Sequence, residues 1–105
     1  MSQINWKERA EHMNFNGQAF INGQRVDALS GATFECISPC DGRKLADVAR
    51  CDKADVDAAV SVAREAFEDG RWAHLSPRKR KEILIRFADL IVQSKNELAL
   101  TETLD

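Results

Sequence analysis

The chain has 105 residues, of which 44% are apolar and 30% are charged, and its formal net charge is −2. This composition is that of an ordinary soluble globular protein, and the charge balance creates no field that favours nucleic acid or anionic lipid. No apolar run approaches the length of a membrane span, and the polar N-terminus lacks the apolar core of a secretory signal. We therefore expect a cytoplasmic protein with one small domain and no nucleic-acid or membrane partner.

The N-terminal half predicts an arm followed by short strands. Residues 1–19 favour an N-terminal arm or one short helix, because apolar side chains recur there at roughly helical spacing. Residues 20–51 favour an antiparallel β meander of three or four short strands, separated by turns at Asn22-Gly23, Ala28–Gly31 and Asp41-Gly42. An Asn-Gly pair suits a two-residue hairpin turn because both central positions need positive φ.

Residues 52–105 predict a helical segment. Asp52 is the expected N-cap of a first helix, which ends at Gly70 in the left-handed conformation. Its apolar stripe consists of Val56, Ala59, Val60, Ala63 and Phe67. Such a stripe predicts one face that is buried against another element.

Two further helices are expected after Gly70. Ser76-Pro77 begins the first of them as N-cap and first helical residue, and Ser94 with Glu97 predicts a capping box for the second. The stripe of the first consists of Leu84, Phe87, Leu90 and Ile91, widened by Ile83 and Ala88. Nothing caps the far end of the last helix, and we expect the chain to be a fragment of a larger fold.

The candidate catalytic residues lack the partners that catalysis needs. The three cysteines, an odd number without an export signal, are expected to be reduced thiols, and no base is positioned to activate Cys36, Cys40 or Cys51. The basic run Arg78–Lys81 favours a solvated helix face, because cations in a first turn oppose the helix dipole. None of the five glycines forms a phosphate-binding loop. From these residues alone, the chain is a soluble α+β domain with no active site.

Read as one string, residues 20–105 resemble the N-terminal portion of the aldehyde dehydrogenase superfamily. The order and spacing of the matching pieces carry the resemblance, rather than any single piece. They are Phe20–Gly23, Thr33-Phe34 through Pro39, Asp41-Gly42, Val56–Val60, Ala63–Phe67, Gly70, Trp72, Arg80, Ala88–Ile91, Glu97–Ala99 and Glu102–Asp105. Ser76-Pro77 followed by Lys79–Lys81 is most similar to the enzymes that oxidise γ-glutamyl-γ-aminobutyraldehyde, with betaine aldehyde dehydrogenases as close rivals.

The resemblance implies a parent enzyme that uses NAD or NADP to oxidise a small-molecule aldehyde to its carboxylic acid, as a homodimer or homotetramer. Residues 20–105 would be the start of an α/β, Rossmann-like dinucleotide-binding domain that is incomplete here. The family's catalytic and cofactor-binding residues follow Asp105, so the resemblance implies that this chain is inactive alone. None of them corresponds to Cys36, Cys40 or Cys51.

The resemblance also implies one site within the chain. Many family members hold a monovalent cation, K⁺ or Na⁺, between a carbonyl at the end of a strand and an aspartate, which correspond here to Ile37 and Asp105. Hard cations take oxygen ligands, so a backbone carbonyl leaves the side chain at position 37 free to vary. An aspartate that caps a local turn is the competing interpretation of Asp105.

A second hypothesis from a different class stays open at this point. The same stripes could belong to a stand-alone helical interaction module without catalysis. The two hypotheses differ in what the stripes do within the chain. A fragment leaves the 56–67 and 84–91 faces exposed, whereas helices that satisfy each other show no large apolar patch.

Overall fold

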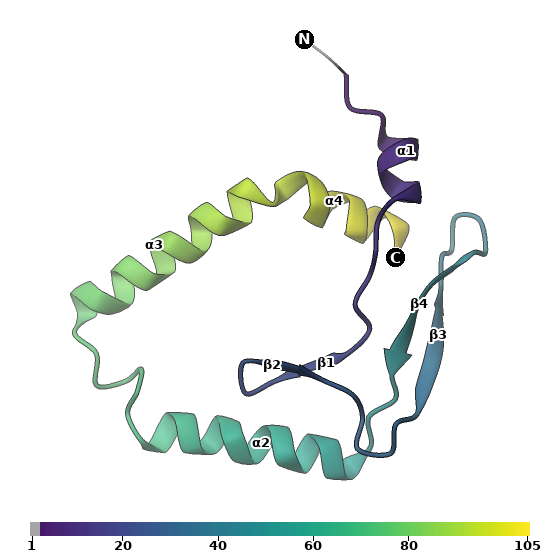
Figure 1. Ribbon diagram of the computed structural model, residues 1–105. Coiled ribbons are helices and arrows are strands. Elements are labelled where there is room, and N and C mark those ends of the chain that lie inside the picture. Colours follow the sequence, from purple (N-terminus) through teal and green to yellow (C-terminus); the bar gives the residue numbers. More distant parts are fainter. Residues whose placement is uncertain (1–2) are drawn as a thin grey trace.

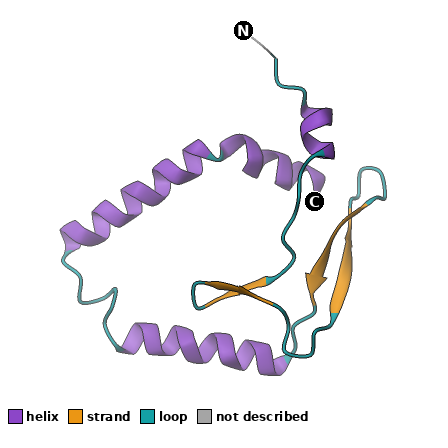
Figure 2. Ribbon diagram, viewed as in Figure 1, coloured by secondary structure: helices purple, strands orange, loops and turns teal. Residues whose placement is uncertain are grey.

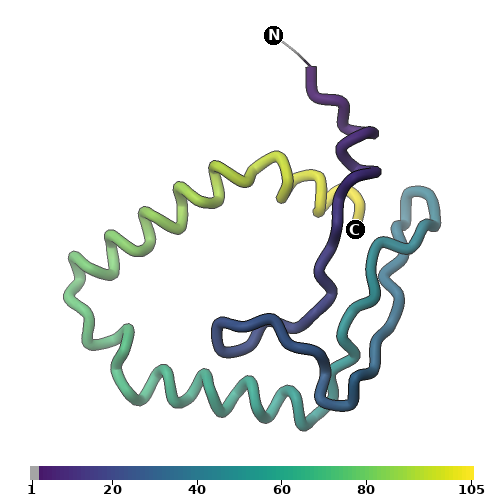
Figure 3. Tube along the Cα trace, viewed as in Figure 1, coloured from purple at the N-terminus to yellow at the C-terminus, as the bar shows by residue number. Residues whose placement is uncertain are grey.

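The computed structural model describes residues 3–105. The chain forms an open arc with its elements arranged along it, and α1 at one end of the chain lies beside α4 at the other (Figure 1). The Cα radius of gyration is 17.8 Å, and the extents are 46 × 43 × 17 Å. A compact chain of this length has a radius of about 13 Å. The arc is therefore one layer thick over much of its path and encloses little core (Figure 3).

The strands form two separate hairpins (Figure 2). Strand β1 (Ala19–Ile21) pairs antiparallel with β2 (Gln24–Val26), and β3 (Thr33–Ile37) pairs antiparallel with β4 (Lys44–Ala49). Among residues 3–105 no ladder joins β2 to β3, so the expected meander is divided into two ladders. The division falls at the 28–31 turn, where Gly31 has φ +75° and its N–H donates to the Ala28 carbonyl.

The hairpin expected at Asn22-Gly23 is confirmed. Asn22 has φ 55° and Gly23 has φ 74°, the backbone that a type I′ turn requires at both central positions. Ala19 faces Val26 and Ile21 faces Gln24 across the ladder. The two strands pair over three residues each.

The helices begin where their caps predict. Helix α1 (Trp6–Glu11) realises the expected short N-terminal helix, and α2 (Lys53–Glu68) begins after Asp52, whose side chain accepts from the Ala54 N–H at 3.0 Å. Gly70 follows α2 with φ +77°, as expected for its end. Helix α3 (Pro77–Gln93) begins after Ser76, whose Oγ accepts from the Lys79 N–H at 3.2 Å.

The expected capping box at the last helix is wrong. Helix α4 (Lys95–Leu104) does begin after Ser94, but the Ser94 side chain makes no capping hydrogen bond. The Ser94 N–H still donates to the Leu90 carbonyl at 3.1 Å, so Ser94 belongs to the last turn of α3 as well. Its near-helical backbone, φ −100° and ψ 11°, takes the hydroxyl away from the N–H groups of α4. Helices α3 and α4 therefore meet at one shared residue.

The chain buries almost no apolar side chain. Among the described residues only Ala28 and Leu100 are buried apolar residues, and α3 contains no buried residue. Val60 in α2 is 60% exposed and Phe87 in α3 is 59% exposed. The stripes thus remain open, as the fragment hypothesis predicts, and the two helices do not cover each other.

Candidate functional site

The structure brings the end of β3 beside the end of α4, the two segments that hold the residues expected to bind a cation, Ile37 and Asp105. The Cys36 thiol donates to Asp105 Oδ1 at an Sγ–O distance of 3.3 Å. Ile37 ends β3 directly after Cys36, and its side chain is exposed. The Cys40 thiol approaches the Thr103 carbonyl at 3.8 Å. Residues 69 positions apart in the chain are therefore neighbours here.

The electrostatics of this junction keep Cys36 neutral. Its hydrogen bond to the Asp105 carboxylate raises the pKa of the Cys36 thiol, and burial and the aspartate charge act in the same direction. A thiolate is the nucleophilic form of cysteine, so this environment disfavours nucleophilic chemistry. Asp105 serves here as a hydrogen-bond acceptor, and the junction is a structural contact rather than a catalytic pair.

Cys51 is held in its thiol form as well. It precedes the N-terminus of α2, where partial burial raises its pKa, followed in effect by the charges of Asp55 and Asp52. Both carboxylates lie near the thiol and oppose its ionisation. All three cysteines are free thiols.

Asp55 is the buried carboxylate that organises the start of α2. Its Oδ2 accepts from the Asp52 N–H at 2.9 Å, and its Oδ1 accepts from the Leu29 N–H at 2.8 Å. The hydrogen bond from the Asp52 backbone, followed by that from Leu29, lowers the pKa of Asp55. Only 4% of its surface is exposed. The helix cap was predicted from the sequence. The hydrogen bond to Leu29 joins residues 26 positions apart, and no local sequence pattern indicates it.

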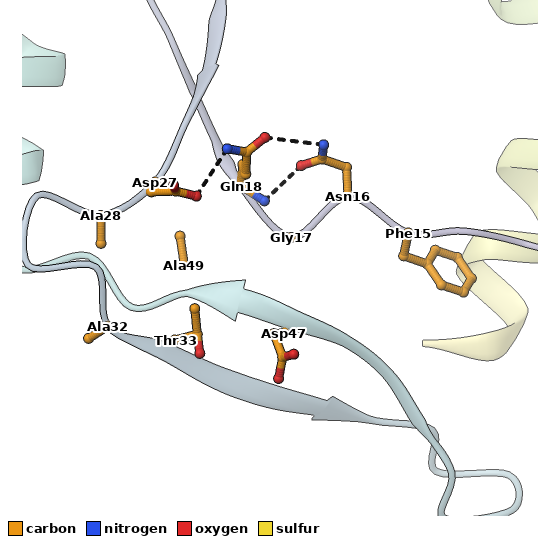
Figure 4. A pocket seen from close by; sticks show the side chains of 10 residues that line it. All are labelled: Phe15, Asn16, Gly17, Gln18, Asp27, Ala28, Ala32, Thr33, Asp47 and Ala49. Atoms are coloured by element: carbon orange, nitrogen blue, oxygen red, sulfur yellow. Dashed lines mark hydrogen bonds between the residues drawn. The ribbon is translucent and has the colours of Figure 1, made fainter.

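A polar cavity lies where the segment after α1 passes over the two hairpins (Figure 4). Its volume is about 220 Å³. Gln18 connects two other residues that line the cavity. Its backbone N–H donates to Asn16 Oδ1 at 2.8 Å, and its side-chain amide donates to Asp27 Oδ1 at 3.0 Å. The other wall carboxylate, Asp47, pairs with Lys44 at 3.2 Å. Each acid therefore has a local partner, and the cavity presents no paired carboxylates for acid–base chemistry.

Gly17 lets this segment approach β4. Its carbonyl accepts from the Ala49 N–H at 2.7 Å, and a Cβ at position 17 would stand 1.9 Å from the Asp47 carbonyl oxygen. Only a residue without a side chain permits that distance. The cavity wall is thus a packing junction between the N-terminal segment and the second hairpin.

The basic run at the start of α3 has a structural role in part. Arg80 folds back and donates to the carbonyls of Ala73 and Leu75, each at 3.0 Å. Arg78 and Lys79 each lie 3.9 Å from Glu82 and are exposed, as a solvated face predicts. Arg80 thereby fixes the α2–α3 link to the helix, a contact that sequence spacing did not indicate.

No described residue offers a cradle for a dinucleotide. A helix N-terminus after a strand is the usual anion site, yet that of α2 is already occupied by the carboxylates of Asp52 and Asp55, which repel phosphate. Within residues 3–105 no three His, Cys, Asp or Glu side chains converge to hold a metal ion, and no helix is long and apolar enough to cross a membrane. The residues present do not fit NAD(P).

The fold and these junctions define the class of protein first. Within residues 3–105, two hairpins and helices with uncovered apolar faces are consistent with part of a larger α/β domain. The sequence pattern of the aldehyde dehydrogenase family matches residues 26–105. The chain belongs to the aldehyde dehydrogenase family.

Three relatives place the chain within that family. It is 43% identical over 105 residues to the aminoacetaldehyde dehydrogenase of Pseudomonas aeruginosa, covering 100% of this chain and 21% of the relative. It superposes on the γ-glutamyl-γ-aminobutyraldehyde dehydrogenase of Burkholderia cenocepacia with a TM-score of 0.93 and 51% identity. It superposes on the indole-3-acetaldehyde dehydrogenase AldA of P. syringae, a complex with NAD⁺, with a TM-score of 0.92 and 54% identity. Both superpositions cover 95% of this chain and 20% of the solved chain. The chain thus spans about a fifth of the length of these three relatives.

Proposed function

We propose that the chain is the N-terminal part of an NAD(P)-dependent aldehyde dehydrogenase that oxidises an aldehyde to its carboxylic acid. The family match over residues 26–105 carries this proposal. The catalytic residues and the hydride acceptor's binding residues would lie outside these 105 residues, because none of the described side chains can supply either. The chain's own part is architectural: two hairpins and two long helices that cover a cofactor domain.

We propose an aminoaldehyde as the substrate class. Relatives named for γ-glutamyl-γ-aminobutyraldehyde and for aminoacetaldehyde match the chain over nearly its whole length. Both names describe aldehydes that carry an amine-derived group. We extend this class to the parent of the present chain, together with a cytoplasmic location and a homo-oligomeric state.

The junction at Asp105 is the place for a K⁺ or Na⁺ ion in this proposal. The Cys36–Asp105 contact of 3.3 Å supports the nearness of the two segments that would hold it. The Ile37 carbonyl and an Asp105 carboxylate oxygen are hard ligands of the kind such ions take. The ion would compete with the Cys36 thiol for Asp105.

A chimera tests the proposed function. The 105 residues replace the matching segment of the Burkholderia cenocepacia relative, and aldehyde-dependent NADH formation is measured for the chimera and for the separate chain. We expect activity in the chimera and none in the chain. A soluble, folded chimera without NADH formation, in an assay where the unaltered relative is active, contradicts the proposal.

A further inference from the structure

Helix α1 is the element that packs most extensively on α4 among the described residues (Figure 1). Trp6 of α1 lines a cavity of about 290 Å³ together with Ala99, Leu100 and Thr103 of α4. Leu100 also lines a second cavity together with Met13, which follows α1. Leu100 is 7% exposed and is one of the two buried apolar residues among those described. The N-terminal segment therefore covers the one apolar side chain that α4 buries.

The C-terminal end of α1 is attached to the second hairpin, formed by β3 and β4. The Arg43 guanidinium donates to the Ala10 carbonyl at 3.1 Å. Ala10 lies in the last turn of α1, where carbonyls lack the regular partner four residues on and the helix dipole favours a cation. Arg43 is itself held in the loop between β3 and β4, because its carbonyl accepts from the Ser38 N–H at 2.9 Å. The hairpin loop thus binds α1 through a charged donor.

The same hairpin reaches the last turn of α4 through two thiols. Cys36 in β3 donates to Asp105 Oδ1 at 3.3 Å, and the Cys40 thiol in the loop approaches the Thr103 carbonyl at 3.8 Å. Thiols are weak hydrogen-bond donors. These two contacts alone hold the end of α4 only weakly, so the packing of α1 on α4 is the firmer attachment.

We propose that α1 is a clasp that keeps the last turn of α4 on the second hairpin and the Cys36 thiol covered. The contacts form a closed ring, in which α1 joins α4, α4 joins the hairpin, and the hairpin joins α1 through Arg43. Release of α1 therefore loosens the contact between Cys36 and Asp105 as well. The ring also positions Ile37 and Asp105 for the proposed K⁺ or Na⁺ ion, and that consequence alone rests on the proposed function.

Alkylation of Cys36 by iodoacetamide tests the clasp in the chimera with the Burkholderia cenocepacia relative. Peptide mass mapping gives the rate at Cys36, which is half-buried, relative to the rate at Cys51, which is exposed and outside the ring. Arg43→Gln removes the donor to α1, and Trp6→Ala removes its contact with α4. We expect each variant to raise the Cys36 rate relative to Cys51 several-fold, because local opening exposes the half-buried thiol.

Two exposed residues supply matched controls. Arg50→Gln removes the same type of side chain from the same hairpin, at the end opposite to its loop, and Lys7→Ala truncates an exposed side chain of α1. Both controls should leave the ratio of rates unchanged. Where Trp6→Ala fails to fold, Arg43→Gln decides the question, because it leaves the apolar packing of α1 on α4 in place.

An unchanged ratio of rates in a folded Arg43→Gln chimera would overturn the inference. An equal rise in Arg50→Gln would overturn it too, because any change on the hairpin would then expose the thiol. A folded parent chimera that forms no NADH contradicts the proposed function instead. The clasp stays supported in that case if Cys36 still reacts faster in Arg43→Gln than in Arg50→Gln.

Discussion

Because the chain has little apolar core, contacts of individual residues join its distant segments. Asp55 and Gly17 join segments that are distant in sequence, one through its carboxylate and the other through its lack of a side chain. Both were present in the sequence as ordinary features, an acidic first-turn residue and a glycine in a polar stretch. Their long-range partners, Leu29 and Asp47, could not be predicted, because local spacing carries no information about a contact made by folding.

The pKa shift of Asp55 predicts a pH-dependent junction. Its folded pKa is lowered below the ordinary value of 3.8, so its stabilising effect is complete above that value. The effect is lost as pH falls through the lowered folded pKa. Hydrogen exchange of the Leu29 and Asp52 amides in the chimera, corrected for intrinsic rates, should show that protection falls in this acidic range.

Asp55→Asn is the variant for this prediction. It keeps the shape of the side chain but lacks the charge, so both amides should lose protection near neutral pH and the acidic step should disappear. Asp57→Asn serves as the control, because Asp57 lies on the same helix and pairs with the exposed Lys53 at 2.7 Å. An acidic step that persists in Asp55→Asn would show that another group is responsible.

At the scale of elements, hydrophobic periodicity and capping residues predicted most of the helices and turns. The stripes of α2 and α3, the Asn22-Gly23 turn and the caps at Asp52 and Ser76 are local signals and were confirmed. The capping box at Ser94 failed because the same residue is still hydrogen-bonded in α3. Sequence patterns treat each helix separately and do not register that two helices share a residue.

The two serines give a matched pair of predictions. Ser76→Ala removes the hydroxyl that accepts from Lys79, and should cost about 1 kcal/mol of unfolding free energy. Ser94→Ala removes a hydroxyl that caps nothing, and should change stability by less than about 0.5 kcal/mol. Urea unfolding of the chimera variants measures both. Equal losses would contradict the difference between the two caps.

At the scale of the whole molecule, the arc has little interior of its own. The fragment hypothesis predicted exposed apolar faces on α2 and α3, and they are exposed. The sequence predicted an antiparallel β meander, whereas the strands form two separate hairpins, since pairing between β2 and β3 depends on packing that periodicity cannot encode. The metal residues Ile37 and Asp105 remain a prediction, with the Cys36–Asp105 contact as the observation in their favour.

The exposed apolar faces and the family match lie in the same part of the chain, residues 26–105. What the chain shares with its relatives is the pattern of surfaces that must fit the rest of the fold, over a fifth of their length. The cofactor and catalytic groups add nothing to that pattern here. In this account the chain acts by packing against the rest of the fold. On its own it leaves the apolar faces of α2 and α3 exposed.

The intact mass of the polypeptide that carries this sequence in its source cells tests this account most directly. Affinity isolation through these 105 residues, followed by mass spectrometry and an assay of aldehyde-dependent NADH formation, gives both quantities from one sample. We expect a mass several times 11.8 kDa together with dehydrogenase activity. A mass of 11.8 kDa, a monomeric state and cooperative unfolding would contradict it and favour the stand-alone interaction module.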